Sequence, residues 1–283
     1  MPTGYDHIVI AVNDLEETIA DYTSAGFTVT PGGEHKHGIS HNALVTFQDG
    51  SYFELIAFRN GGEGHGTHWP ITLQKGEGIV DYALRTSDLE QEVRHLRVSG
   101  LDYSDPKDGG RFRPDGQRVD WQTIRYGEGA SVPARLPFYC HDLTERTLRV
   151  PGGVNAVHAN GVTGIAGVSV VVRDLDAASK DFVALTGDAG SDVQSTLPDV
   201  SGARRFAIGA AWVEVVQPAA HASELRAYLE NRGELPCQVT LVSPEGSGDV
   251  LSGQLTHGAR LLVASEPGIP TGFTDADRSG SPK

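Results

Sequence analysis

The feature that most restricts the fold is an internal repeat: a short apolar run, an Asp-Leu pair and a helix-like segment that ends on glycine. The apolar runs cover residues 5–12, 78–86 and 168–172, and the pairs stand at 14–15, 88–89 and 174–175. Gly26, Gly100 and Gly187 close the three copies, the third being one residue longer. A unit that recurs in this way favours an architecture of stacked modules.

Each copy predicts a strand followed by an amphipathic helix. Acidic residues follow the start of the helix, where they suit its positive end. Leu15, Ile19 and Tyr22 recur at three- and four-residue steps and form one apolar stripe. The closing glycine supplies the left-handed turn that ends a helix.

Further strands are predicted after each helix. In the first copy they cover 27–30, 41–47 and 51–58, in the second 117–126 and 134–140, and in the third 203–208 and 211–217. A shorter fourth copy has strands at 238–242 and 259–264 and no clear helix. We therefore predict an α+β fold of tandem βαβββ modules that form cupped mixed sheets. Residues 1–145 form one module pair, with modules at about 4–58 and 77–142; residues 160–265 form a second pair, and 266–283 a disordered tail.

Composition excludes several classes of function. The net charge of −14 disfavours binding to nucleic acid, which needs clustered Lys and Arg. The longest apolar runs are far shorter than the roughly 20 residues of a membrane helix. The first residues have no signal-peptide pattern. These observations predict a cytoplasmic protein with a small-molecule partner and with neither nucleic acid nor membrane as a partner. A homodimer and a monomer both remain open at this point.

The repeat resembles the vicinal oxygen chelate superfamily, which includes glyoxalase I, bleomycin-resistance proteins and extradiol dioxygenases, and within it the glyoxalase-like domain proteins. The residues that carry the resemblance are 5–10 with Asp14-Leu15, the segments 38–44 and 52–56, Gly76-Glu77-Gly78, and 111–116. In this superfamily two modules form a cup around a divalent metal ion, which holds two oxygens of the substrate.

The resemblance implies metal ligands on the first and last strands of the paired modules. In module one these positions hold His7 and Glu54, which alternation turns toward the cup, while Ile8 and Ile10 face the other way toward the helix. A carboxylate inside a strand costs several kcal/mol unless it is paired or bound to metal. In module two the matching positions hold Asp81, a possible ligand, and a residue near Phe138, which cannot bind metal. The ion that the resemblance implies is Zn, Ni, Mn or Fe.

Other histidines offer weaker candidates. His41 begins the third strand of module one and is either a third ligand, a general base, a donor that orients a ligand, or a surface residue. Its neighbour Asn42 is a candidate substrate-binding residue. His35, His37, His65 and His68 lie in glycine-rich loops and are expected to be exposed or to belong to a lid. Trp69 either closes such a lid over the substrate or packs in the core.

Arg111, Arg113 and Arg118 flank a hairpin turn in an otherwise acidic chain. They either form local ion pairs or hold an anionic group of the substrate.

The predicted function is that of a metal-dependent vicinal oxygen chelate enzyme. It would act as a lyase or isomerase on a small oxygenated metabolite, a carbonyl, diol or hydroxy acid, with Glu54 and His41 as catalytic residues. The alternatives are a metal-free binding or resistance protein and a ring-cleaving dioxygenase. The dioxygenase is less favoured because a second first-strand histidine is missing.

Overall fold

The first two modules form one closed barrel of eight strands. The computed structural model describes residues 2–35, 38–127, 135–246 and 248–265, so the predicted tail at 266–283 lies outside the described residues. The barrel has the strand order β1-β4-β3-β2-β6-β7-β8-β5. Its strands are β1 (Gly4–Ala11), β2 (Thr30–His35), β3 (Ser40–Thr46), β4 (Tyr52–Phe58), β5 (Gly78–Arg85), β6 (Lys107–Phe112), β7 (Arg118–Ile124) and β8 (Phe138–Asp142).

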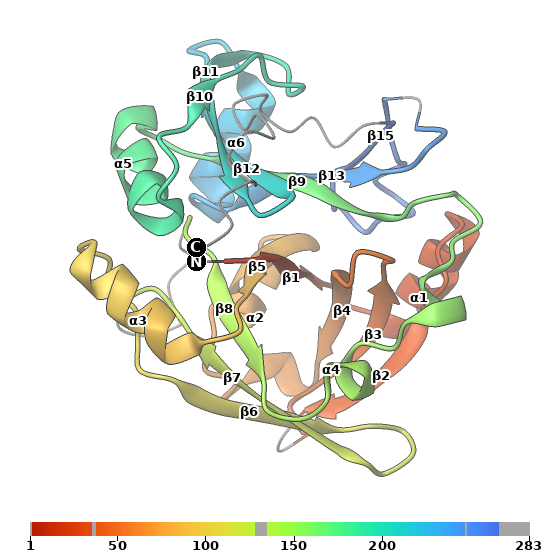
Figure 1. The fold of residues 1–283 in the computed structure, drawn as a ribbon. Coiled ribbons are helices and arrows are strands. Elements are labelled where there is room, and N and C mark those ends of the chain that lie inside the picture. The colour runs from red at the N-terminus through yellow and green to blue at the C-terminus, as the bar shows by residue number, and fades with distance from the viewer. Residues whose placement is uncertain (1, 36–37, 128–134, 247, 266–283) are drawn as a thin grey trace, which may run out of the picture.

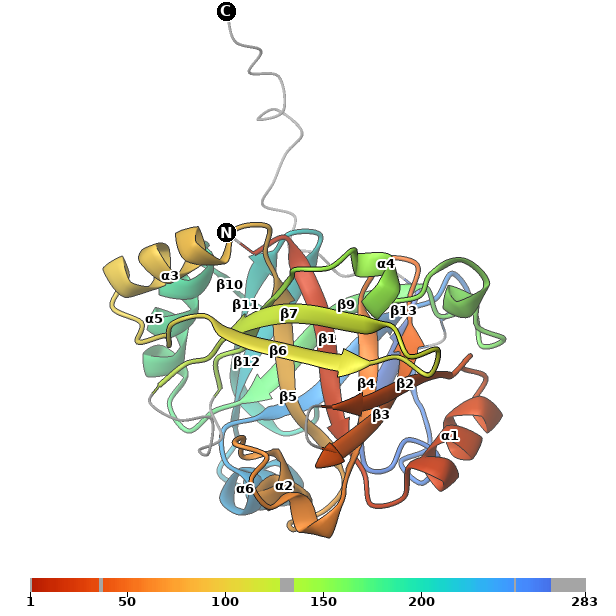
Figure 2. The same ribbon diagram turned by 90° about the horizontal axis from the view of Figure 1, so that it is seen from below.

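The two modules of the barrel repeat one topology. In each, the first strand pairs in parallel with the last, β1 with β4 and β5 with β8, and the other neighbours are antiparallel. Antiparallel pairing of β1 with β5 and of β2 with β6 joins the modules and closes the barrel. The prediction of βαβββ modules in cupped mixed sheets is confirmed. Figure 2 looks onto β6 and β7, with β1 and β5 behind them.

The helices of the repeat begin and end as predicted. They are α1 (Leu15–Ser24), α3 (Leu89–Val98) and α5 (Leu175–Thr186). The side chains of Asp14, Asp88 and Asp174 cap their N-termini by accepting hydrogen bonds from backbone N–H groups of the first turn. The three closing glycines all have φ between +71° and +88°, a region that favours glycine.

The third and fourth modules form a seven-stranded sheet in the order β10-β11-β12-β9-β13-β15-β14. Module four passes from β13 to β14 without a helix in the part of the chain that the structure describes. The strands are β9 (Gly164–Val171), β10 (Ser191–Asp192), β11 (Val200–Ile208), β12 (Ala211–Pro218), β13 (Pro236–Val242), β14 (Asp249–Val250) and β15 (Leu261–Ala264). The helices outside the repeat are α2 (Trp69–Leu73), α4 (Arg146–Arg149) and α6 (Ser223–Arg232), with 3-10 turns at η2 (Asn60–Gly62) and η3 (Gly153–Ala156).

The outer face of the central barrel strands is covered by this second sheet. Ile8 and Ile10 share one buried core with Val168 of β9 and Leu241 of β13. The Tyr5 hydroxyl donates a 2.6 Å hydrogen bond to a backbone carbonyl of β12. Helices α1 and α3 contact β3 and β4, and β7 and β8. The core that contains Ile8 and Ile10 also includes Leu15 and Tyr22 of α1. The prediction that this aliphatic face is turned toward the helix therefore named only part of its surroundings, because the second sheet packs back to back with the barrel here (Figure 1).

Within the described residues, no helix combines the length and the apolar character needed to span a bilayer.

Because the barrel and the second sheet share one core, we expect them to unfold together. Leu241→Ala removes a fully buried side chain from that core and should lower the free energy of unfolding by about 2–5 kcal/mol. Leu143→Ala, at a side chain that is 53% exposed, is the matched control and should change it by less than about 0.5 kcal/mol. Urea unfolding followed by fluorescence and by circular dichroism measures both. Two separate transitions would contradict the shared core.

Candidate active site

The inner face of the barrel surrounds a cavity of about 310 Å³. That volume lies at the lower end of the range for small-molecule sites. Its walls combine aromatic rings, three arginines, a group of histidines around Glu54, and a second carboxylate, Asp108. The residues that line it include His7, His35, Ser40, Asn42, Tyr52, Glu54, His65, Trp69, Arg111, Trp121, Thr123, Arg125, Phe138, Cys140 and Arg149.

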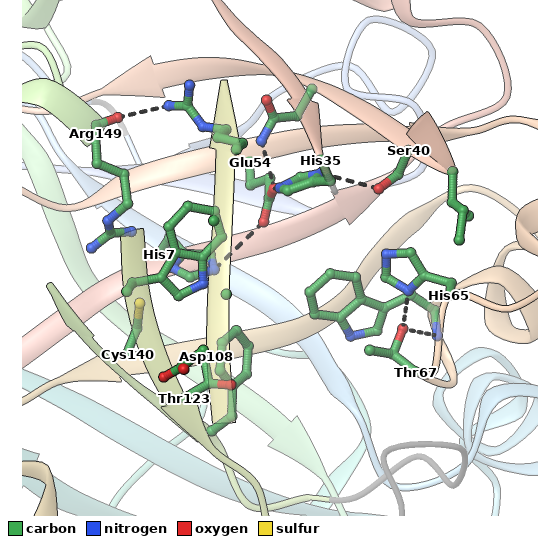
Figure 3. A pocket seen from close by; sticks show the side chains of 18 of the residues that line it. His7, His35, Ser40, Glu54, His65, Thr67, Asp108, Thr123, Cys140 and Arg149 are labelled. Atoms are coloured by element: carbon green, nitrogen blue, oxygen red, sulfur yellow. Dashed lines mark hydrogen bonds and ion pairs between the residues drawn. The ribbon is translucent and has the colours of Figure 1, made fainter. Parts of the chain in front are cut away.

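Glu54 on β4 is the centre of the polar side of this cavity. Asn42 Nδ2 donates a 2.6 Å hydrogen bond to Glu54 Oε1, and His35 Nε2 lies 3.4 Å from the same oxygen. His7 Nε2 lies 3.6 Å from the other oxygen, Oε2. Figure 3 shows the Glu54 carboxylate between the two imidazole rings. The inward orientation predicted for His7 and Glu54 by strand alternation is what the structure shows.

The surroundings of Glu54 keep it ionised. Burial by itself raises the pKa of the carboxyl group, but His35, His7, the Asn42 hydrogen bond and Arg111 together outweigh burial and lower it. The pKa of His35 is lowered as well, because burial lowers it more than Glu54 raises it. The site therefore presents a carboxylate beside a neutral imidazole at neutral pH.

His7 is fixed in orientation by the residue that precedes it. Asp6 is completely buried, and its Oδ1 lies 2.6 Å from His7 Nδ1. The register of β1 against β5 shifts between Tyr5 and His7, and such bulges commonly re-aim side chains near active sites. Since an ionised Asp6 accepts the Nδ1 proton, the ring is held with Nε2 toward Glu54.

Asp6 is itself held by two arginines. Arg149 donates from both terminal nitrogens to Asp6, at 3.0 and 2.9 Å, and Arg146 donates at 2.6 Å. Burial raises the pKa of Asp6, but Arg149, His7 and Arg146 outweigh it and hold that pKa well below its usual range. The carboxylate that orients His7 thus stays charged across the physiological pH range.

Asp81 is placed differently from its counterpart His7. Its Oδ2 accepts hydrogen bonds from Trp69 Nε1 and from an Arg125 terminal nitrogen, both at 2.8 Å, and lies 3.6 Å from His68 Nε2. Its Oδ1 accepts the backbone N–H of Tyr82. Burial raises the pKa of Asp81, but His68, Arg125 and Trp69 together lower it. Both oxygens of Asp81 are engaged, and the residue lies outside the cavity lining.

The structure does not bring all the predicted site residues together. Ser40 and Asn42 face the cavity from β3, and strand alternation places His41 between them on the opposite face. Arg111 lines the cavity. Arg113 and Arg118 lie on the outer surface, where they form ion pairs with Asp115 and Asp120 at 3.1 and 2.6 Å.

Several cavity residues were not predicted from the sequence. His35 and His65, expected in exposed loops or a lid, line the cavity; His68 is buried, and His37 lies outside the described residues. Burial lowers the pKa of His65 to about 4, so this ring is neutral. The one sequence signal for Asp6 is its position next to His7.

Cys140 also lines the cavity, and burial raises the pKa of its thiol. It is therefore a packing residue rather than a nucleophile.

The residues present do not form a metal centre in this arrangement. Among the residues that the structure describes, no three His, Cys, Asp or Glu side chains are grouped as ligands of one ion. His7 and Glu54 face the cavity, but Asp81 is committed to Arg125 and Trp69, and Phe138 offers only carbon. The two ligands that module two supplies in the superfamily are therefore missing from this arrangement.

The fold and this cavity define a protein of the vicinal oxygen chelate class. The family model described as a glyoxalase-like domain matches residues 5–186, and the chain belongs to this family. No curated protein sequence matches it.

Solved structures share the fold at low sequence identity. A hypothetical protein from Staphylococcus aureus has a TM-score of 0.68 at 14% identity, over 92% of this chain and 98% of its own. 4-Hydroxymandelate synthase from Streptomyces coelicolor, solved as a triple mutant, has a TM-score of 0.52 at 13% identity, over 86% of this chain and 72% of its own. A xylose isomerase-like TIM barrel/4-hydroxyphenylpyruvate dioxygenase fusion protein has a TM-score of 0.52 at 13% identity, over 86% of this chain and 36% of its own.

Removing the Asp6 charge should destabilise the barrel strongly, because it takes away one of the two carboxylates that pair with the buried Arg149 and leaves its hydrogen-bond donors on that side unmatched. We expect Asp6→Asn to lower the free energy of unfolding by about 3–5 kcal/mol at pH 7. The folded-state pKa of Asp6 is depressed, so its contribution is complete above the unfolded pKa of about 3.9 and is lost as the pH falls further. Urea unfolding from pH 7 to 3 should show a constant difference that shrinks only below about pH 4.

The control is Asp115→Asn, which removes an exposed ion pair with Arg113 and should change stability little. An Asp6→Asn protein as stable as the wild type would refute the role of this network.

Proposed function

We propose that the protein is an enzyme that transfers a proton on a small oxygenated metabolite, as a lyase or an isomerase, with Glu54 as the proton acceptor. The observation that carries this proposal is the buried, ionised Glu54 carboxylate facing the cavity between two imidazoles. Buried titratable groups with perturbed pKa values that face a cavity are candidates for acid–base chemistry.

The depressed pKa of Glu54 narrows the class of substrate. A carboxylate with a lowered pKa is a weak base, so it can remove a proton only from a carbon that is already acidified. A carbon next to a carbonyl group meets this requirement. We therefore propose that the substrate is a small carbonyl compound, or a hydroxy acid whose C–H group lies next to the carboxyl carbon.

The neighbouring residues would hold and move the proton. Asn42 and His35 fix Oε1 of Glu54, which leaves Oε2 toward His7. His7, oriented by Asp6, can take the proton from Glu54 through Nε2. Return of the proton to a neighbouring atom of the substrate gives an isomerase, and its delivery to a departing group gives a lyase.

Replacing Glu54 tests this proposal. In D2O, we expect the wild type to exchange the acidic C–H protons of at least one small keto or hydroxy acid, followed by proton NMR over a panel of such compounds. Glu54→Gln keeps the size of the side chain and removes the base, and should slow exchange by about 10²–10⁴-fold.

Glu214→Gln is the matched control, since Glu214 is a fully buried carboxylate at the corresponding position of β12, away from the cavity. It should exchange at the wild-type rate. Exchange that survives in Glu54→Gln would refute the assignment. Compounds that bind to the cavity of the wild type without any exchange would favour the alternative, a binding or resistance protein.

The metal dependence predicted from the sequence has its own test. Because module two supplies no ligand from its two matching positions, we expect protein purified without a histidine tag to hold Zn, Ni, Mn or Fe at well below one equivalent, by elemental analysis. A stoichiometric ion in the wild type that is absent from both His7→Ala and Glu54→Gln, and present in Glu214→Gln, would overturn this expectation. It would establish the metal-dependent form of the same function.

A further inference from the structure

Three arginines line the cavity, and their hydrogen bonds distinguish them. Arg149 uses all of its donors, on Asp6, Asp142 and the Tyr52 hydroxyl. Arg111 donates from its two terminal nitrogens to the backbone carbonyls of Gly32 and Arg149. The terminal nitrogens of these two guanidinium groups thus form hydrogen bonds to other groups of the protein around the cavity.

Arg125 is different from the other two. Its Nη1 donates to Asp81 Oδ2 at 2.8 Å, and within the described part of the chain its Nε and Nη2 have no hydrogen-bond partner. Its side chain is 19% exposed and lines the cavity. The Nε and Nη2 edge of a guanidinium is the fork that matches the two oxygens of a carboxylate.

The guanidinium of Arg125 is also held rigidly. Its central carbon lies 4.0 Å from the centre of the Phe138 ring and 4.9 Å from that of Trp69. Trp69 Nε1 and Arg125 share the same oxygen of Asp81, so one buried carboxylate positions both the cation and the ring beneath it. A cation fixed in this way needs no reorganisation when it binds an anion.

We propose that Arg125 is the group that binds the substrate, and that the substrate carries a carboxylate on a flat apolar body. The carboxylate takes the Nε and Nη2 fork of Arg125. The body lies against the aromatic walls of the cavity, whose volume of about 310 Å³ admits one small molecule. Phe138 contacts both Arg125 and His7, with 5.2 Å between the Phe138 and His7 ring centres, so a ligand along this ring reaches from the cation to the acid–base group.

The ligand should carry a single negative charge. Glu54 is ionised at the other side of the cavity and repels a second carboxylate. Asp81 does not repel the ligand in the same way, because it lies outside the cavity lining and forms an ion pair with Arg125. This inference rests on the proposed function for the reaction that follows binding, but the binding itself can be measured without turnover.

The test uses benzoate as the probe and benzamide, its neutral analogue of nearly equal size, as the reference ligand. By calorimetry we expect the wild type to bind benzoate at least about tenfold more tightly than benzamide. A pair of charge-assisted hydrogen bonds increases affinity by about this factor. Arg125→Lys keeps the charge opposite Asp81 but loses the fork, and should weaken benzoate binding about tenfold with little effect on benzamide.

A second variant guards against a folding defect. The double variant Asp81→Asn/Arg125→Gln removes both partners of the buried pair, so that no unpaired charge is left inside the protein. It should bind benzoate no better than benzamide. Arg118→Gln, at an arginine on the outer surface, is the matched control and should bind benzoate as the wild type does.

Equal affinities for benzoate and benzamide in the wild type, no benzoate binding at all, or wild-type affinity in both Arg125 variants would overturn the inference. Loss of benzoate binding in Arg118→Gln would overturn it as well. Glu54→Gln separates this inference from the proposed function. Benzoate should still bind to that variant, whether or not the variant has lost proton exchange.

Discussion

The antiparallel pairing of β1 with β5 is the constraint on which the rest of the structure depends. It joins the two modules of the barrel, and each strand of the pair is buried along its full length except at the last residue of β5. The outer face is apolar and lies against the second sheet. The inner face therefore has to carry whatever polar groups the site needs. His7 on β1 lines the cavity, and Asp81 on β5 lies behind the cavity wall, where it binds Trp69 and Arg125, which line it.

Because both faces are buried, a polar side chain here lowers the stability of the fold unless it has a hydrogen-bond or ion-pair partner. The two modules meet this requirement in different ways. In module one, His7 is bonded to Asp6, whose charge is matched by Arg149 and Arg146. In module two, Arg125 is the one arginine within the described ranges that pairs with Asp81. The two modules repeat the same backbone topology but carry different charged groups. Module one places His7 at the cavity, and module two places Arg125 there.

The parts of this arrangement that depend on neighbours in the sequence could be predicted from it. Asp14 and Gly26 mark the ends of a helix by local hydrogen bonds and backbone preference, and alternation along a strand is enough to turn His7 and Glu54 inward. The parts that depend on pairing between distant segments could not. Strand β6, with Gly109 and Gly110, has no apolar alternation and was missed. Arg125 was missed as well, because only the folding of β7 beside β8 brings it over Phe138 and toward Asp81.

The third module shows why position in the repeat does not by itself make a site. Glu214 stands on the last strand of module three, as Glu54 does in module one, and is fully buried. Its oxygens accept hydrogen bonds from Arg205, Ser195 and Ser169. The partner position on the first strand is Gly167, where an added Cβ would lie 2.1 Å from the Trp212 side chain. The ring of Trp212 therefore fills the place that an inward side chain of this strand would take, and Arg205 lies over that ring at 3.9 Å. In module one the corresponding partners are imidazoles and an amide at the edge of a cavity, so the same residue type at the same position faces a space that a small molecule can enter.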